Sequence, residues 1–350
     1  MAAGTEPAVV RLSELVDGQE ATCFALLASK YRGVTKRNEP FVKCMFRDRA
    51  ASLEAPVWAN HPLIEEAVEW AEGMAYRLHV RVSSHHQFGL QLNVLAIRPA
   101  SEAEDGADGY NFQELVESSK YSVAMLVAKI DAVIDRYVTE PHLRRLVQSL
   151  LEEHKDLFRK MPAASNMHHA YTAGLLEHVW SMARISGFLA DHYGQYYEEL
   201  NPPLERSVVV AAAILHDIGK IRELDYNPSG ARYTTEGCLV GHILMGRDMV
   251  REAARKIEGF PEPILMNLEH AILAHHGRKE YGAPILPQTI EALLVSYIDD
   301  LDAKINIAAR TILTCTTDGD FTDRVYALDN RRLYKGIPSI PPEIDEPEIL

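Results

Sequence analysis

Histidine and aspartate residues are concentrated in the second half of the sequence, where their spacing suits metal binding. Nine of the fifteen histidines lie between positions 168 and 276. The pattern is a lone histidine, a histidine–aspartate doublet, further histidines and a later aspartate pair: His178, His216-Asp217, His242, His275-His276 and Asp299-Asp300. Imidazole and carboxylate together suit divalent ions such as Mn²⁺, Fe²⁺, Co²⁺ or Zn²⁺. Because the doublet carboxylate can bridge two ions, the pattern predicts a metal centre, most economically a dinuclear one.

The segment ILHDIGK (214–220) carries the strongest part of this prediction. A single histidine on a helix more often caps the helix, forms a hydrogen bond or lies at the surface than binds a metal. Here an apolar run leads into His216, Asp217 and Lys220. Burying these ionisable groups is costly unless they have partners, and a metal ion supplies them. The pair His85-His86, by contrast, is expected at the surface without a chemical role.

Helices are expected to position these groups. Between 123 and 137 the apolar residues follow the i, i+3, i+4, i+7 spacing of one helical face. Similar patterns continue along the chain, at 142–159, 173–191, 204–216, 240–257, 262–275 and 287–313. The segment 223–235 interrupts them and predicts a hairpin with an Asn-Pro-Ser-Gly turn. Several helices could therefore bring the candidate ligands to one interior point.

The first hundred residues have a different pattern. Runs rich in β-branched or aromatic residues, several with period-two alternation, predict strands at 21–29, 40–46, 76–84 and 90–97. A short helical piece at 62–73 separates the second run from the third. About five strands with one interposed helix predict a small closed β-barrel of the OB type.

The chain is therefore expected to be multidomain, with a small β-barrel followed by an all-α domain. We place the barrel at 1–100, and 101–111 is acidic and aperiodic, as expected of a linker. The helical domain follows at 112–335, and the proline-rich acidic tail at 336–350 is expected to be extended.

Charge and composition leave the partner open. The net charge of −14 argues against a nucleic-acid partner, because proteins that bind polyanions usually have a basic surface. However, residues 1–100 carry 11 basic and 11 acidic residues, and 30–49 contain seven Lys or Arg against two acids. The four cysteines form no CxxC pair and are expected to be reduced thiols. The sequence contains no signal peptide or membrane-spanning run, so a cytoplasmic protein without a membrane partner is expected.

Residues 162–310 resemble the HD superfamily of metal-dependent phosphohydrolases, whose signature is a lone His, a His-Asp doublet and a distal Asp. More narrowly, the ordered motifs are similar to YhaM-type 3′–5′ exoribonucleases, from PAASNMHHAYTAGLLEHVWSM through AAAILHDIGKIREL and GHILMG to FTDRVYALDNRRLY. In that family an OB-fold precedes the HD domain, which is the order expected here. The chain departs from the family at Ala173-Gly174, where Gly-Gly is usual, and in RDRAASLEAPVWA of the more divergent barrel.

The resemblance implies a role for each candidate residue. It assigns two divalent ions, Mn²⁺ first with Fe²⁺, Co²⁺ or Zn²⁺ as alternatives, to seven ligands: His178, His216, Asp217, His242, His275, His276 and Asp299. Asp217 would bridge the ions, and Lys220 would lie close to the scissile phosphate. His169 could contact the phosphate or donate a proton. The alternatives are a solvated helix-end position for Lys220 and simple packing for His169.

Basic and aromatic residues alternate in the barrel as single-strand binding requires, because cations follow phosphates and bases stack on rings. The expected contacts with nucleic acid are Lys30, Tyr31, Arg32, Lys36, Arg37, Phe41 and Lys43. The alternative is that the rings belong to the barrel core and the charges are only solvated.

Together these features favour a metal-dependent phosphodiesterase that degrades single-stranded RNA, or DNA, from its 3′ end and releases nucleoside 5′-monophosphates. The alternative is an HD phosphohydrolase of small nucleotides or cyclic dinucleotides in which the barrel serves assembly. A scaffold with a vestigial site is disfavoured by the intact ligand set. The GYP element of cyclic-dinucleotide enzymes does not follow the doublet, which mildly favours a polymer. Formation of a homo-oligomer is left open.

Overall fold

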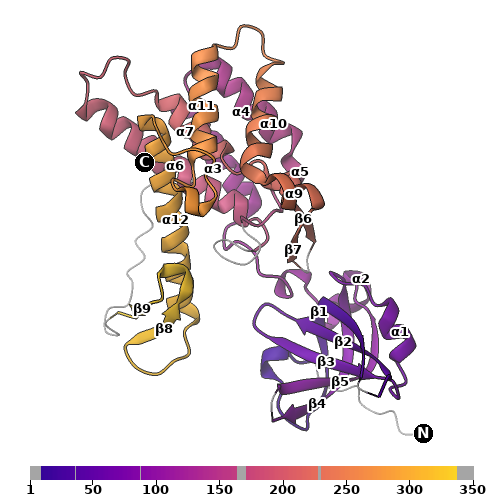
Figure 1. Ribbon diagram of the computed structural model, residues 1–350. Coiled ribbons are helices and arrows are strands. Elements are labelled where there is room, and N and C mark those ends of the chain that lie inside the picture. The colour runs from indigo at the N-terminus through magenta and orange to yellow at the C-terminus, as the bar shows by residue number, and fades with distance from the viewer. Residues whose placement is uncertain (1–8, 36, 87, 164–170, 228–229, 337–350) are drawn as a thin grey trace.

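The computed structural model describes residues 9–35, 37–86, 88–163, 171–227 and 230–336. Figure 1 shows the N-terminal strands as one unit and the helices as a larger one, from which the long helix α12 extends downward. Each unit has its own hydrophobic core. The predicted order, a β-barrel followed by a helical domain, is therefore confirmed.

The N-terminal unit is a five-stranded barrel with one short helix. Its elements are β1 (Glu20–Val34), β2 (Pro40–Arg47), β3 (Ser52–Trp58), α1 (Ile64–Glu69), β4 (Ala75–His85) and β5 (Gly89–Pro99). The strands pair in the order β1-β2-β3-β5-β4, and β4 returns to β1. β3 and β5 join through a single parallel pair, Glu54 opposite Gln91. Period-two alternation explains the core, because Val42, Cys44 and Phe46 are buried on one face of β2.

The segment expected to be an aperiodic linker has structure and is fastened to the barrel. It contains α2 (Glu102–Asp105) and η2 (Gly106–Asp108), followed by η3 (Phe112–Glu114). The Asp105 carboxylate is fully buried and accepts hydrogen bonds from Arg77 and Arg98 on the barrel strands. Further along, Leu115 and Val116 share a small apolar cluster with barrel residues. Burial of these groups corrects the expectation of a free linker at 101–111.

The helical unit is built around a central buried helix. Its helices are α3 (Val123–Tyr137), α4 (Pro141–Glu153), α5 (Lys155–Phe158), α6 (Gly174–Tyr196), α7 (Arg206–Leu215), α8 (Lys220–Glu223), α9 (Thr235–Val240), α10 (His242–Ala254), α11 (Glu262–Ala274) and α12 (Ile290–Thr314), with η4 (Lys279–Tyr281) after α11. The sequence of α7 has no polar face, and every residue from Ser207 to Leu215 is buried. The surrounding helices pack on α7, so its C-terminal end reaches the interior of the domain.

Two hairpins accompany the helices. β6 (Leu224–Asn227) and β7 (Gly230–Tyr233) form the hairpin predicted at 223–235. β8 (Phe321–Val325) and β9 (Arg331–Tyr334), with η5 (Tyr326–Leu328) between them, form a second hairpin beyond α12 that the sequence patterns did not predict. Across the described ranges, no helix is both long and apolar enough to cross a membrane. Of the expected extended tail, 337–350 lies outside the described residues.

Candidate metal centre and nucleic-acid surface

The seven candidate ligands come from five parts of the helical unit and meet in its interior. His178 lies on α6, His216 and Asp217 follow α7, His242 begins α10, His275 and His276 end α11, and Asp299 lies within α12. Their side chains form groups close enough to share an ion: His178 with His216 and Asp217, His216 with His275 and Asp299, and His242 with His275 and His276. The structure therefore brings all seven predicted ligands together.

Asp217 lies at the centre of this cluster. Its Oδ2 is 3.2 Å from Nε2 of His216 and 4.0 Å from Nε2 of His178. Its Oδ1 is 3.4 Å from Nε2 of His242 and 3.8 Å from Nε2 of His275. One carboxylate thus faces two separate histidine groups, one with each oxygen.

Three buried atoms at this point have no hydrogen-bond partner among the described residues: Asp217 Oδ1, His242 Nε2 and His275 Nε2. Buried polar atoms are rarely left unsatisfied, because losing water without replacement is costly. A divalent cation would satisfy all three, and imidazole and carboxylate are suitable donors for it. The residues present therefore fit a metal centre.

Each histidine is oriented through its other ring nitrogen. The Nδ1 atoms lie 2.7–3.0 Å from oxygen partners, which are Asp302 for His178, Ala213 for His216, Glu223 for His242, Ile272 for His275 and Tyr281 for His276. These contacts direct the Nε2 atoms into the cluster. Asp302 and Glu223 were not expected from the sequence, although Asp302 follows Asp299 by three residues and so shares its face of α12.

The aspartate pair is resolved by its position on α12. Asp299 Oδ1 lies 3.3 Å from His178 Nε2, inside the cluster. The Asp300 side chain is 46% exposed and forms an ion pair of 2.6 Å with Lys304. Adjacent helical residues point about 100° apart, so only one of them can face the site. Asp299 is the candidate ligand.

Burial and the two carboxylates control protonation in the cluster. Burial by itself lowers the pKa of His178, but its hydrogen bonds with Asp299 and Asp302 outweigh this and raise the pKa to about 9. Burial, with His276 nearby, holds the pKa of His275 well below its usual value. Burial would raise the pKa of Asp217, yet the Lys220 and His216 charges hold it well below the ordinary range. Asp217 is therefore ionised and His275 neutral, as metal ligands need, whereas His178 must lose a proton before it can bind an ion.

Lys220 is part of the same buried network. Its Nζ lies 2.6 Å from Asp217 Oδ2, and the residue is 7% exposed. The alternative of a solvated helix-end lysine is therefore wrong. His169 lies outside the described residues. His270, whose Nε2 accepts a hydrogen bond from the Gln288 amide, takes a structural position.

The barrel carries a row of aromatic rings on the outside of β1, β2 and β3. The ring centroids of Tyr31 and Phe41 lie 6.0 Å apart, and those of Phe41 and Trp58 lie 5.5 Å apart. Tyr31 is 63% exposed and Trp58 is 49% exposed. Phe88, on the β4–β5 turn, is exposed too, and the Lys43 ammonium lies over its ring. Trp58 and Phe88 were missed because they lie outside the basic stretch 30–49.

The basic residues expected beside these rings differ in their surroundings. The Lys30 ammonium donates hydrogen bonds to the carbonyls of Val68 and Trp70. Lys30 therefore stabilises the barrel and is no longer a candidate contact for nucleic acid. Arg32 donates one hydrogen bond to Val68 but stays exposed, and Arg37 is exposed as well. Lys43 pairs with Glu54 at 2.5 Å. Lys36 lies outside the described residues.

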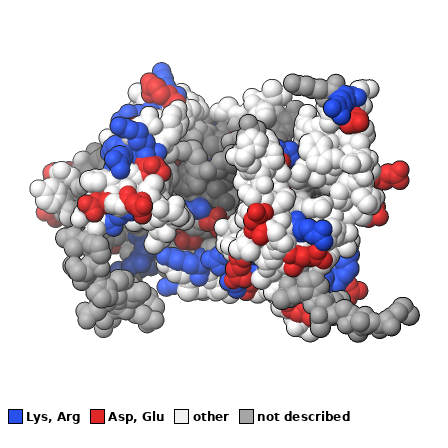
Figure 2. All heavy atoms as spheres, turned by 90° about the horizontal axis from the view of Figure 1, so that it is seen from below, with Lys and Arg blue, Asp and Glu red and all other residues white. Residues whose placement is uncertain are grey.

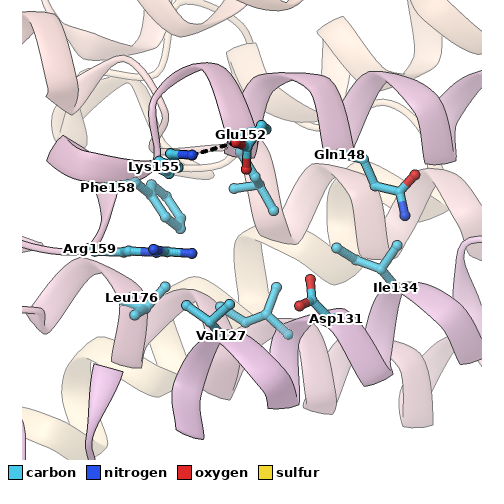
Figure 3. Close-up of a pocket in the computed structure, with 11 residues that line it drawn as sticks. Val127, Asp131, Ile134, Gln148, Glu152, Lys155, Phe158, Arg159 and Leu176 are labelled. Carbon is cyan, nitrogen blue, oxygen red and sulfur yellow. Dashed lines mark hydrogen bonds and ion pairs between the residues drawn. The ribbon is translucent and has the colours of Figure 1, made fainter. Parts of the chain in front are cut away.

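A cavity of about 310 Å³ lies elsewhere in the helical unit, between α3 and the α4–α5 region. Figure 3 shows Val127, Ile134 and Leu176 around it, together with the charged side chains of Asp131 and Arg159. None of the seven candidate ligands lines it. The cavity is therefore separate from the metal centre.

Comparison with known proteins agrees with this geometry. The HD domain family model matches residues 175–304. The 3′–5′ exoribonuclease YhaM of Shouchella clausii is 34% identical over 328 residues, which cover 93% of this chain and 94% of that protein. The protein of the same name from Bacillus subtilis is 33% identical over 318 residues, covering 91% of this chain and 95% of the relative.

Among solved structures, a domain of replication protein A from Methanococcus maripaludis is similar to 27% of this chain. The similarity covers 96% of that domain, with 20% identity and a TM-score of 0.22.

Proposed function

Because this chain belongs to the YhaM family of 3′–5′ exoribonucleases, we propose that it shortens single-stranded RNA from the 3′ end and releases nucleoside 5′-monophosphates. The chain is a hydrolase with a metal-dependent HD domain. The observation that carries the proposal is the buried Asp217 carboxylate, which faces a different histidine group with each oxygen.

This arrangement supports two divalent ions, with manganese as the first expectation. One ion would be held by His178, His216 and Asp299. The other would be held by His242, His275 and His276, and Asp217 would contact both ions. When bound, such ions activate water as a nucleophile and offset the negative charge of the phosphate. The protein supplies the fixed Nε2 directions and a dry interior in which charges act strongly.

Lys220 is suited to stabilise charge on the phosphate. Its ammonium is nearly buried and is held at the cluster by an ion pair with Asp217. A substrate phosphate would give this ammonium a second anionic partner. We therefore assign Lys220 to the phosphoryl oxygens or the leaving oxygen.

The barrel supports a polymeric substrate. Its exposed rings suit base stacking, and the adjacent Arg32, Arg37 and Lys43 suit phosphates. Figure 2 shows the surface hollowed between the barrel and the C-terminal hairpin, with Lys and Arg side chains among Asp and Glu at the border. A strand lying there could contact the barrel while its end enters the helical unit. Hydrolysis of a small nucleotide would require this ring surface to serve assembly instead.

A short 5′-labelled RNA, incubated with metal-supplemented protein, tests the proposal. We expect a ladder of products shortened from the 3′ end, together with nucleoside 5′-monophosphates. Asp217→Asn should abolish the ladder, whereas Asp300→Asn, at the exposed neighbouring carboxylate, should preserve it. Intact RNA alongside rapid hydrolysis of a cyclic dinucleotide would favour the small-nucleotide alternative.

A further inference from the structure

The long helix α12 is only half covered by its own chain. Its buried residues all lie in the first half: Glu291, Ala292, Val295, Ser296 and Ile298. Within the described parts of the chain, no residue of α12 after Ile298 is buried, and the helix extends away from the other helices (Figure 1). Helices gain most of their stability from packing an apolar face. The C-terminal hairpin and Glu117 contact part of this outer half, but one face of it stays exposed.

Its exposed apolar side chains form one continuous stripe. Ile290, Leu293, Tyr297, Leu301 and Ile305 follow one another at three or four residues, which places them on a single face. Their exposed fractions are 40%, 42%, 72%, 50% and 61%. The opposite face carries Asp299 and Asp302 into the metal centre, so the stripe points away from the site.

The end of α6 continues this surface. Tyr193 and Tyr197 line a mainly apolar hollow of about 270 Å³ together with Leu293 and Tyr297 of α12. Tyr196 contacts Tyr197 edge to face at 4.8 Å and extends the surface along α6. The whole surface, named here the α6–α12 face, comprises Phe188, Tyr193, Tyr196, Tyr197, Ile290, Leu293, Tyr297, Leu301 and Ile305.

The size of the α6–α12 face suits a stable protein interface. With roughly 150–250 Å² for a full aromatic side chain, its exposed fractions add up to on the order of 1,000 Å². The largest apolar patch of a typical monomer covers only about 300–600 Å². A standard interface needs about 800 Å² from each partner.

Two partners could cover this face, the C-terminal tail or a second copy of the chain, and the charge on the face favours the second copy. Along the α12 stripe Lys304 is the one cation among the described residues, and it is already paired with Asp300. The tail 337–350, with four acidic residues in fourteen, would find little compensating charge there. Arg184, one turn before Phe188, lies at the border, as expected of a polar rim. A second copy offers a matching neutral, apolar helix face, with which the same residues can pair about a twofold axis.

We propose that the α6–α12 face joins two copies of this chain into a homodimer. The contact covers the exposed apolar side chains of α12, among them Leu301 and Ile305. Each copy keeps its metal centre, because the ligands lie on the opposite face of α12. The barrels, which contribute no residue to this face, remain available to a strand.

Sedimentation velocity of the full-length protein over a concentration series tests this proposal. We expect a dimer for the wild type. Tyr297→Glu and Ile305→Glu should each weaken the dimer tenfold or more, because each buries a charge in the apolar centre. Leu239→Glu on α9, where Leu239 is 80% exposed outside the face, should leave the dimer unchanged.

Hydrogen exchange of 301–314 provides a readout that does not depend on mass. Exchange should be slow in the dimer and should accelerate on dilution and in the Ile305→Glu variant. A wild type that is monomeric at every concentration would overturn the proposal. So would protection of 301–314 that is independent of concentration and disappears in a chain ending at Gly336, because the tail would then be the occupant.

Discussion

At the scale of single residues, two carboxylates outside the centre orient two of the histidines that face it. Asp302 accepts from Nδ1 of His178 at 2.7 Å and Glu223 from Nδ1 of His242 at 2.9 Å. Such a contact fixes the tautomer and ring direction and increases the basicity of the opposite nitrogen. Asp302 and Glu223 therefore act as positioning residues, one for each histidine group.

Asp302→Asn should lower the affinity for a divalent metal by about 10–100-fold without unfolding the protein, because the amide orients His178 less strongly. Asp300→Asn is the matched control, since Asp300 lies two residues away but pairs only with Lys304 on the surface. Competition with a chromophoric chelator measures both affinities. Equal affinities for the two variants would remove the positioning role from Asp302.

Lys220→Ala should keep metal affinity but slow turnover by about 10²–10³, because one group that stabilises the transition state is lost. Lys155→Ala serves as control. Lys155 pairs with Glu152 three residues away, as Lys220 pairs with Asp217, but the Lys155–Glu152 pair is exposed. Turnover at saturating RNA is the measurement. A rate matching that of Lys155→Ala would contradict the assignment.

At the scale of elements, the outer faces of β1, β2 and β3 turn a structural barrel into a binding surface. Phe46 is buried in the core, whereas Phe41 lies outside between Tyr31 and Trp58. Gly33 makes this possible, because a Cβ there would lie 2.7 Å from the Phe41 ring. The alternation of side chains along β2 thus buries Phe46 in the core and places Phe41 on the outer surface.

Trp58→Ala should weaken RNA binding by about 1–3 kcal/mol, the value of one stacked base. Leu157→Ala, which removes a 50% exposed apolar side chain on α5, away from the proposed path of the strand, is the control. Fluorescence anisotropy with labelled RNA, in an Asp217→Asn background that prevents cleavage, gives both affinities. Unchanged binding by Trp58→Ala would favour the interpretation of the barrel as an assembly module.

Asp105 on α2 makes barrel stability depend on pH. The hydrogen bond from Arg98, above all, holds the pKa of Asp105 well below its usual value, although burial opposes this. Because the unfolded pKa is higher, at about 3.9, the ionised carboxylate stabilises the fold above that pH. This contribution is lost as the pH falls toward the lower, folded pKa.

Asp105→Asn should therefore reduce the free energy of unfolding by about 1–3 kcal/mol at neutral pH. The difference from wild type should shrink as the pH falls below about 4. Asp108→Asn, which removes a half-exposed partner of Arg77, should cost less and change less with pH. Urea unfolding at several pH values measures these differences, and a gap that does not vary with pH would contradict the account.

At the scale of the whole molecule, the barrel and the helical unit have separate cores and are proposed to divide the work between RNA binding and hydrolysis. The packing of Leu115 and Val116 on Phe24 and Leu26 sets the division between them near Glu117. A cut at Asn111 would leave Phe112, Leu115 and Val116 without their barrel partners.

A chain beginning at Glu117 should hydrolyse bis-nitrophenyl phosphate at a rate comparable to the full-length protein but degrade RNA much more weakly. The salt dependence of binding should also flatten, because the barrel cations no longer release counterions from the phosphates. Circular dichroism must first show that the shortened chain folds. Undiminished RNA degradation would mean that the barrel serves assembly.

The sequence by itself determined the chemistry and the order of the elements. His178, the His216-Asp217 doublet and the later histidines were recognisable because helical periodicity and ligand type are local properties. The hairpin at 223–235 was likewise predictable from its turn residues. In contrast, β3 was not identified separately, because Glu54 and Pro56 weaken its strand pattern, although it pairs with β2 across a short turn.

Only the tertiary structure decided which side chains face which space. The choice of Asp299 over Asp300 depends on the rotation of α12 against α6, and the partners of Asp302 and Glu223 lie 124 and 19 residues away along the chain. Lys30 was removed from the predicted binding residues because it contacts Val68 and Trp70 at the end of α1. Trp58 and Phe88 were added because the folded barrel places them beside Phe41 and Lys43. Asp105 and Leu115 pack on the barrel although their sequence is irregular. Contacts between distant segments have no local pattern, so the folded chain alone determines them.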